Sequence, residues 1–167
     1  MNSKSAIKTA KKLGINGKNI HFIPNVIDID GIEVFDKNNN DVINILYVGR
    51  LLKSKRVDIF ISVFKKILAL NKFSISAKII GDGDELFNLK ETCQSDYLLK
   101  DKIQFLGSLD VNELPKYYKK ADIFLFCSDY EGTPNVIIEA MSYGLAIVSS
   151  EVGDIKDYTP KKISVRK

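Results

Sequence analysis

The sequence has few residues of the kinds that build metal sites or disulfide frameworks. Among 167 residues there are two cysteines, Cys93 and Cys127, and one histidine, His21. Two distant cysteines give neither paired zinc spacing nor a disulfide framework, which favours a reducing, cytoplasmic compartment. Because a lone histidine in a short predicted strand is more often packed or exposed than catalytic, we assign it no role as a base. A DID triplet at 28–30 lacks a surrounding strand pattern, so no metal is assigned.

Long apolar runs are also missing. The opening stretch MNSKSAIKTAKKLG has no apolar core of signal-peptide length, and no later segment reaches the ~20 apolar residues of a membrane span. We therefore expect neither export nor a transmembrane helix. The net charge of +4 favours an anionic ligand or membrane headgroups, which leaves peripheral association with the inner face of the membrane open. This charge is too small and too scattered to indicate nucleic-acid binding.

Short apolar runs alternate with amphipathic stretches from residue 43 onward. The apolar runs are INILYVG, AKIIG, IQFLG and DIFLF, and VDIFISVFKKILAL, ELFNLKETC and ELPKYYKK separate them. Because the runs are nearly continuous, they indicate strands covered on both faces, so an α/β fold with a Rossmann-like, doubly wound parallel sheet is predicted. Ser54 and Asp84 are expected to cap two of its helices. Ligands bind such sheets beyond the carboxyl ends of the strands. We expect four positions there: Arg50, Gly81, Gly107 and Glu131.

Composition divides the chain into three parts. Residues 1–41 contain a lysine-rich stretch that predicts a helix from Ser3 to Leu13, then a predicted short strand, IHFIP, and a polar linker. Residues 42–158 form the predicted sheet domain. Residues 159–167 are polar and basic without periodicity, which is typical of a frayed tail.

The segment EGTPNVIIEAMSYGLAIVSS, from Glu131 to Ser150, combines two glutamates, a helix start and a buried strand. Thr133 is expected to cap the helix, Pro134 to fit its first turn, and Gly144 to follow its end. A helix N-terminus presents unpaired N–H groups and a positive partial charge. A sugar phosphate is therefore expected near Gly132 to Asn135.

Five blocks occur in a recognisable order: GRLLKSKRVD, GDGD, FLG, YYKKADIFLFCSDYEGTPNVIIEAMSYG and VGDIKDY. From Val42 to Tyr158 the chain thereby resembles the donor-binding domain of family 4 glycosyltransferases. The resemblance implies the C-terminal half of a GT-B fold, in which two Rossmann-like domains face a cleft and a nucleoside-diphosphate sugar binds without a metal. It also implies that Ser3 to Val26 correspond to the end of an acceptor domain, and that the chain is cut at both ends and inactive alone.

The resemblance assigns roles to individual residues. Arg50 and Lys55 match a basic pair that stabilises the diphosphate leaving group. Glu131 matches an acid that contacts the donor sugar near the reacting centre, and Glu139 matches one that accepts hydrogen bonds from the ribose. The implied catalytic residues are Glu131, Arg50 and Lys55, and the implied substrate-binding residues are Arg50, Lys55, Gly132, Thr133, Pro134, Asn135 and Glu139. The alternatives are ordinary solvated basic residues, an exposed loop acid and a polar helix stripe in which Ile137 and Met141 face the core.

Two residues depart from the family pattern. Arg56 stands where many members have glycine, which is expected to alter the turn before the helix. Asp154 replaces the second of two glycines near the phosphates, after Gly153. In GDGD, Gly81 and Gly83 permit a tight backbone, either for the fold or for close approach of the ligand.

The function implied is transfer of a sugar, with retention, from a nucleoside-diphosphate sugar to an acceptor glycan or lipid-linked acceptor in surface glycan or polysaccharide biosynthesis. Two alternatives stay open: a non-catalytic nucleotide-sugar-binding fragment, and a nucleotide-sugar epimerase of the same architecture. Nucleotide-sugar binding without a transfer product would indicate the fragment. Conversion of the donor in the absence of an acceptor would indicate the epimerase. An NAD-binding domain is disfavoured because GRLLKSKR offers one glycine where G-x-G-x-x-G is needed.

Overall fold

A computed structural model describes residues 1–27 and 42–155 and contains a five-stranded, wholly parallel sheet. Its strand order is β3-β2-β1-β4-β5. The strands are β1 (Val42–Val48), β2 (Ser74–Ile80), β3 (Ile103–Gly107), β4 (Ile123–Phe126) and β5 (Ala146–Ser149). The predicted Rossmann-like sheet is thus confirmed, and the order reverses direction between β1 and β4, where a ligand crevice forms in such folds.

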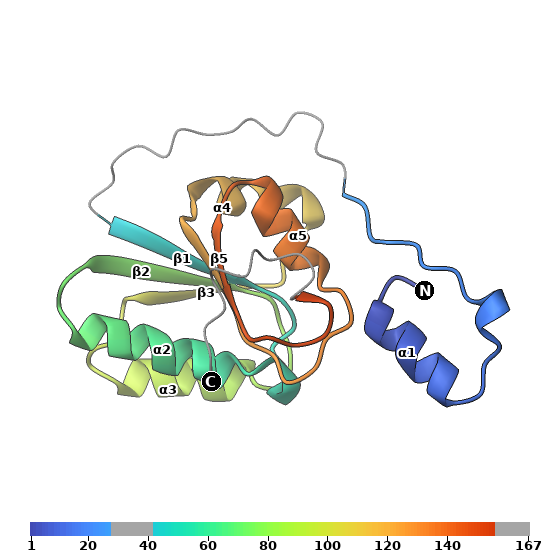
Figure 1. Cartoon of the computed structure of the whole chain (residues 1–167). Coiled ribbons are helices and arrows are strands. Elements are labelled where there is room, and N and C mark those ends of the chain that lie inside the picture. The colour runs from blue at the N-terminus through green and yellow to red at the C-terminus, as the bar shows by residue number, and fades with distance from the viewer. Residues whose placement is uncertain (28–41, 156–167) are drawn as a thin grey trace.

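Helices cover both faces of the sheet, as a doubly wound fold requires. Figure 1 shows α2 (Val57–Ala69) and α3 (Leu86–Ser95) on one face and α4 (Pro115–Lys120) and α5 (Asn135–Ser142) on the other. Two short 3-10 turns, η2 (Lys53–Lys55) and η3 (Val111–Glu113), precede α2 and α4. Each strand therefore delivers its following loop to one edge of the sheet.

The core is built around an aromatic cluster at the centre of the sheet. The Tyr47 ring stacks on Phe126 and meets Phe60 edge-on, with centroids 6.0 Å apart in both pairs. Phe60 and Phe64 are fully buried on α2. Phe64 belongs to an apolar stripe at helical spacing, which predicts a buried helix face and consists of Val57, Ile61, Phe64 and Leu68. Burying each such side chain contributes about 1.5–3 kcal/mol, so this cluster holds the strand ends in place.

The second strand departs from the expectation that both faces are covered. Along β2, buried Ile75, Ala77 and Ile79 alternate with Ser76 and Lys78, which stay partly exposed. The buried set faces α2 and α3, whereas Ser76 and Lys78 line a hollow beside α4. Because α4 has only six residues, it is too short to shield this face of β2.

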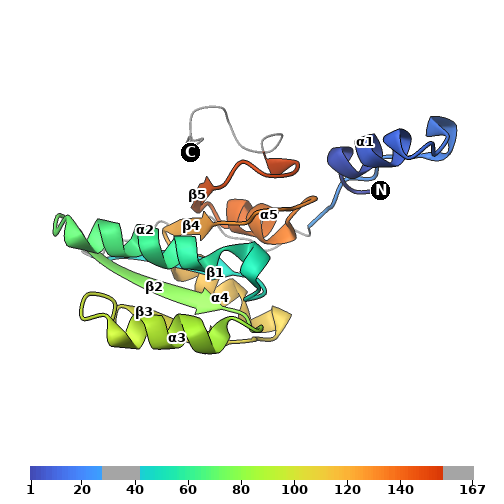
Figure 2. The same cartoon turned by 90° about the horizontal axis from the view of Figure 1, so that it is seen from below.

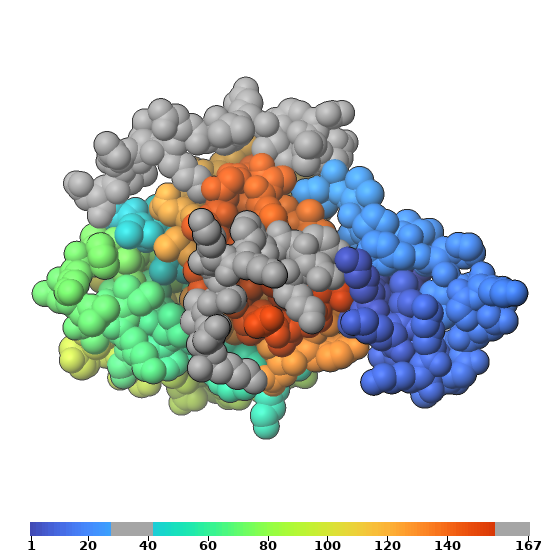
Figure 3. All heavy atoms as spheres, in the orientation of Figure 1, coloured from blue at the N-terminus to red at the C-terminus, as the bar shows by residue number. Residues whose placement is uncertain are grey.

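The N-terminal segment lies at the carboxyl edge of the sheet. Figure 2 shows α1 (Lys4–Lys12) on the side to which the β2 arrow points, and Figure 3 shows the segment as a lobe against the sheet domain. The helix is one residue shorter at each end than the predicted Ser3 to Leu13, because Ser3 and Leu13 are its caps, and the Ser3 hydroxyl accepts the Ala6 N–H at 3.2 Å. A short turn, η1 (Gly17–Asn19), follows it. The strand predicted at 20–24 is absent, because these residues pair with no strand among the described ones.

The predicted linker, the DID triplet and the tail 159–167 lie outside the described residues. Among the helices that the structure describes, none combines the length and the apolarity needed to cross a membrane.

Candidate functional site

The loops after β1 and β2 pack backbone against backbone at the carboxyl edge. The Leu51 N–H donates to the Asp82 carbonyl at 2.8 Å, and the Leu51 carbonyl accepts the Glu85 N–H at 3.0 Å. A Cβ on Gly81 would lie 1.8 Å from the Gly49 carbonyl oxygen, which no side chain tolerates. The glycines of GDGD therefore serve contact between two loops of the protein. The prediction that Asp84 caps α3 was wrong, because Glu85 occupies that position and makes no side-chain cap.

The loops after β1 and β4 are joined by an ion pair between Lys55 and Glu131. The two side chains are 17% and 10% exposed. Two further hydrogen bonds join the same loops, because the Ser54 carbonyl accepts the Asp129 N–H at 2.8 Å and the Ser128 hydroxyl at 3.2 Å. The structure thus brings together a basic and an acidic residue that the sequence assigned to one site.

Arg56 takes the left-handed conformation for which glycine is favoured, with φ 46° and ψ 44°. Its guanidinium pairs with Asp58 at 3.0 Å and with Asp129 at 3.1 Å, and hydrogen bonds to these carboxylates raise its pKa. These pairs hold the side chain against the β4 loop. The prediction that Ser54 caps the following helix was wrong: α2 begins at Val57, after Arg56, with no side-chain cap.

Arg50 lies exposed directly after β1, where it was predicted, and within the described residues it makes no ion pair. Its carbonyl accepts the Tyr47 hydroxyl at 3.2 Å. Burial raises the pKa of Tyr47, and the charge of Glu131 raises it further. The backbone of Arg50 is therefore fixed while its guanidinium reaches solvent.

The entry of α5 differs from its prediction in how it is capped. The helix begins at Asn135, with Pro134 before it and no side-chain cap. The Thr133 hydroxyl instead donates to the Asn2 carbonyl at 2.8 Å, and the Asn25 amide contacts the Asn135 side chain. A long-range contact thus takes the place of the local cap. Gly144, at φ 70°, follows the helix as predicted.

Glu139 projects from α5 toward α4. Its carboxylate accepts a hydrogen bond from the buried Tyr118 hydroxyl at 2.9 Å, and the Tyr118 ring stacks on Tyr143 with centroids 5.4 Å apart. Burial raises the pKa of Tyr118, and the Glu139 charge adds to this. Tyr118 was missed as a partner, and its only signal was its place in the apolar pattern of α4. Ile137 is buried as expected, but Met141 is exposed and not in the core.

Asp154 is a second residue whose role was missed. It is buried, and its carboxylate accepts the N–H groups of Lys4 at 2.6 Å and Ser5 at 3.1 Å, while its own N–H donates to the Gly132 carbonyl at 3.0 Å. Gly153 beside it, at φ 58°, packs so closely that a Cβ would lie 2.3 Å from the Glu131 carbonyl oxygen. This loop therefore fixes the Glu131–Gly132 backbone and holds the start of α1.

The predicted site residues fall into two groups. Lys55 and Glu131 are in contact, and Gly132 to Asn135 continue from Glu131 into α5. Among the described residues, no side-chain hydrogen bond or ion pair joins this group to Arg50 or to Glu139. Residues 1–27 and 42–155 contain no cluster of three His, Cys, Asp or Glu that could hold a metal ion. Metal independence stays a prediction.

The fold and the edge of polar loops define an α/β protein with a Rossmann-like sheet and a site at its switch point. The family model of the group 1 glycosyl transferases matches residues 28–162, and the chain belongs to that family. The chain is 32% identical over 155 residues to the UDP-Gal:alpha-D-GlcNAc-diphosphoundecaprenol alpha-1,3-galactosyltransferase of Escherichia coli. It is 27% identical over 157 residues to the phosphatidylinositol N-acetylglucosaminyltransferase gpi3 subunit of Schizosaccharomyces pombe.

These alignments cover 85% and 93% of this chain but 39% and 34% of the relatives, so the chain spans well under half of their length. Among solved structures, Anabaena HepE in complex with UDP-glucose matches with a TM-score of 0.78 at 21% identity. That match covers 95% of this chain and 46% of the HepE chain. The lipopolysaccharide outer core galactosyltransferase WaaB matches with a TM-score of 0.72 at 24% identity, over 90% and 42% of the two chains. The GT-B type of fold that the resemblance implied is confirmed.

Proposed function

We propose that this chain is the donor-binding part of a retaining glycosyltransferase that uses a nucleoside-diphosphate sugar. The observation that carries the proposal is the Lys55–Glu131 pair, which joins the basic loop after β1 to the acidic loop after β4. Family membership supports the proposal, as do the E. coli relative, named for a UDP-galactose donor, and HepE, solved with UDP-glucose.

The proposed chemistry divides the charges of the donor among these groups. When the bond between the anomeric carbon and the diphosphate breaks, negative charge grows on the departing oxygen and positive charge on the sugar. Arg50 and Lys55 stabilise the diphosphate, and Glu131 stabilises the sugar. The new bond forms to an acceptor oxygen, whose proton passes to the leaving phosphate. The lysine ammonium has three donors, so Lys55 serves Glu131 and a phosphate together.

The start of α5 and the side chain of Glu139 complete the proposed donor site. The N–H groups of Asn135 and Val136 make no hydrogen bond within the described residues and are suited to phosphate oxygens. One Glu139 oxygen holds Tyr118, and the other is left to accept from a ribose hydroxyl. The side chains of Thr133 and Asn135 contact the N-terminal segment, so this loop contributes through its backbone.

Isothermal titration calorimetry with UDP, GDP and their sugars tests the proposal, together with a transfer assay that uses a lipid-linked acceptor. We expect a diphosphate nucleotide to bind wild type and to bind Arg50→Ala at least about tenfold more weakly, which is ~1.4 kcal/mol. Lys53→Ala, which removes an exposed lysine of the same loop, is the matched control. Equal affinity in all three proteins would refute the leaving-group role, and binding without transfer would limit the chain to donor binding.

A further inference from the structure

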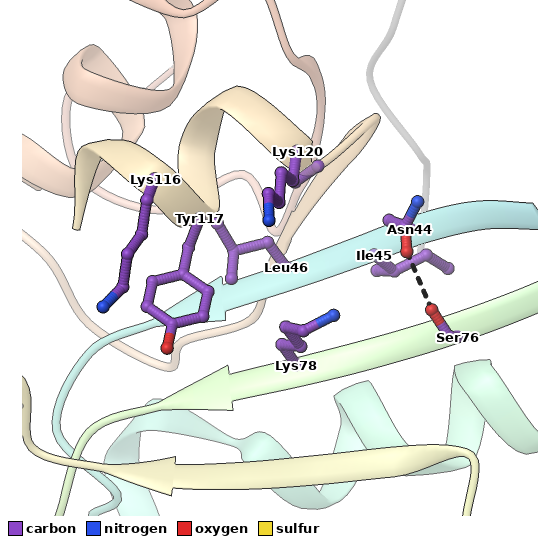
Figure 4. A pocket seen from close by; sticks show the side chains of 9 residues that line it. Asn44, Ile45, Leu46, Ser76, Lys78, Lys116, Tyr117 and Lys120 are labelled. Carbon is purple, nitrogen blue, oxygen red and sulfur yellow. Dashed lines mark hydrogen bonds between the residues drawn. The ribbon is translucent and has the colours of Figure 1, made fainter. Parts of the chain in front are cut away.

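A hollow lined by lysines lies between α4 and the strands β1 and β2 (Figure 4). Its volume is about 200 Å³, below the ~300–1,000 Å³ of pockets that enclose larger organic ligands. Among the described residues, the polar ones that line it are Asn44, Ser76, Lys78, Lys116, Tyr117 and Lys120, and none of those lining it is an aspartate or glutamate. A space of this size and charge suits a small anion.

The hollow lies away from the proposed donor site. On its floor, Asn44 pairs with Ser76 and Leu46 with Lys78 across the β1–β2 register, and the Ser76 hydroxyl donates to the Asn44 side chain at 2.9 Å. The first pair lies in the amino-terminal half of the strands, and the second lies one residue past their middle. The donor loops leave the opposite, carboxyl ends, so one small ligand cannot contact both places.

Lys78 is an unusual residue for the face of a parallel sheet. Such faces are normally apolar because helices cover them, yet this side chain is only partly exposed and makes no ion pair within the described residues. Placing an ammonium where solvation is reduced costs free energy unless a counter-charge is present. Figure 4 shows Lys78 and Lys120 projecting into the space between the sheet and α4.

One lysine at the edge of the hollow already has an anionic partner. Lys116 pairs with Glu113 at 2.8 Å and lies over the Tyr117 ring, 5.1 Å from its centroid. Both members of the pair are about half exposed, and such pairs contribute little, so Lys116 can turn to another anion. Asp122 contacts the floor, where its carboxylate accepts the Asn44 main-chain N–H at 2.8 Å and the Asn44 side-chain amide at 3.5 Å. Among the described residues, the three lysines thus leave the hollow with an excess of positive charge.

We propose that this hollow is a binding site for a small phosphate-bearing anion, separate from the donor site. Lys78 and Lys120 supply the charge from opposite sides. The Tyr117 hydroxyl supplies a neutral donor, and Lys116 closes the outer edge. The phosphate is either free, as in a phosphomonoester or pyrophosphate, or is the headgroup of an acidic lipid, and the same donors recognise both.

Titration of the full 167-residue chain with inorganic pyrophosphate tests this site, with excess UDP present so that the donor loops are occupied. We expect Lys78→Gln combined with Lys120→Gln to weaken pyrophosphate binding at least about tenfold and to leave UDP affinity unchanged. Lys66→Gln combined with Lys72→Gln removes the same charge from exposed positions elsewhere and should bind like wild type. Circular dichroism checks that the variants fold, and Lys120→Gln alone is the fallback because Lys120 is exposed.

Co-sedimentation with vesicles that contain phosphatidic acid, against vesicles of neutral lipid, identifies the source of the phosphate. Pyrophosphate binding that the paired glutamine variant abolishes supports a free anion. Vesicle binding that the same variant abolishes, without pyrophosphate binding, supports a lipid headgroup. Absence of both, or binding that the two paired variants reduce equally, would overturn the proposal. A loss of UDP binding alone bears on the donor site and not on this one.

Discussion

The carboxylate of Asp154 accepts the main-chain N–H of Lys4 at 2.6 Å, across 150 positions of sequence. The same carboxylate accepts the Ser5 N–H, so it caps the first turn of α1 from outside the helix. Its own N–H holds the Gly132 carbonyl, which starts the proposed donor loop. One side chain thus connects the N-terminal helix with the loop that leads into α5.

We expect Asp154→Ala to release α1 while leaving the sheet intact. Hydrogen bonds to a charged group contribute about 1.5–3 kcal/mol each to stability, so the amides of α1 should exchange with solvent at least about tenfold faster. Hydrogen exchange resolved by residue measures this, with the exposed Asp84→Ala as the control. Unchanged protection of α1 in the Asp154 variant would show that the helix is held by other contacts.

The docking of α1 should weaken in acid. Burial opposes ionisation of Asp154, but the hydrogen bonds from Lys4 and Ser5 outweigh it and lower the pKa of this carboxyl. Because the pKa is lower in the folded state, the ionised carboxylate stabilises the docked helix at pH values above the unfolded pKa of ~3.9. This stabilisation is lost as the pH falls through the folded pKa. Exchange of α1 amides, corrected for intrinsic rates, should therefore rise below pH ~4 in wild type. It should stay flat across this range in Asp154→Ala.

Arg50→Ala and Lys55→Ala should differ in stability, although both are expected to weaken diphosphate binding. Arg50 is exposed and without an ion pair among the described residues, so its removal leaves unfolding nearly unchanged. Removing Lys55 leaves Glu131 nearly buried and unpaired, which costs about 1–3 kcal/mol, below the ~3–5 kcal/mol of a fully buried pair. Urea unfolding separates the two cases. Equal stability of both variants would mean that the pair is not formed in solution.

Periodicity predicted the parts of the fold that depend on neighbouring residues. Phe64 on α2 lies on the apolar stripe and is buried, and Gly144 follows α5 with the positive φ expected of a residue just past a helix end. The polar face of β2 was not predicted, because AKIIG alone is mostly apolar. The alternation of polar and apolar residues becomes visible only when Ser76 and the residues before it are included. The length of α4 depends on tertiary packing, and so does the part of the β2 face that this short helix leaves uncovered.

The capping residues and the partners of the site could not be read from local sequence. Thr133 has the right chemistry for a cap, but its hydroxyl is taken by the Asn2 carbonyl, 131 positions away. The family resemblance assigned roles to Lys55, Glu131 and Glu139, yet it did not indicate that Tyr118 holds Glu139. Such contacts depend on how the loops converge after folding.

Gly81→Ala and Gly107→Ala should separate the free-energy cost of a steric clash from the cost of an unfavourable backbone conformation. Both glycines have positive φ, at 139° and 70°, but only at Gly81 does a Cβ meet backbone, 1.8 Å from the Gly49 oxygen, whereas Gly107 has open space around it. We expect Gly107→Ala to cost about 1 kcal/mol and Gly81→Ala more than ~4 kcal/mol, because two strand ends must separate. Chemical denaturation gives both values. Similar costs would show that the loops after β1 and β2 do not pack closely.

Tyr118→Phe should loosen Glu139 and weaken nucleoside binding more than binding of free diphosphate. The variant removes one hydrogen bond to a charged group and keeps the stacked ring, so we expect a loss of about 1–2 kcal/mol of stability at pH 7. Titration calorimetry with uridine, UDP and pyrophosphate measures the binding, and Tyr130→Phe, at an exposed position, is the control.

Tyr118→Phe should also differ from wild type in how its stability depends on pH in the alkaline range. Burial and the Glu139 charge raise the pKa of Tyr118, so its phenol stabilises the fold fully below the unfolded value of ~10 and loses this contribution as pH rises toward the folded value. Wild type should therefore lose stability more steeply than Tyr118→Phe between pH 9 and pH ~11, and the difference between them should shrink. Lysines titrate in both proteins and cancel in the comparison. Parallel curves would show that the Tyr118 hydroxyl is solvated and that Glu139 is held by something else.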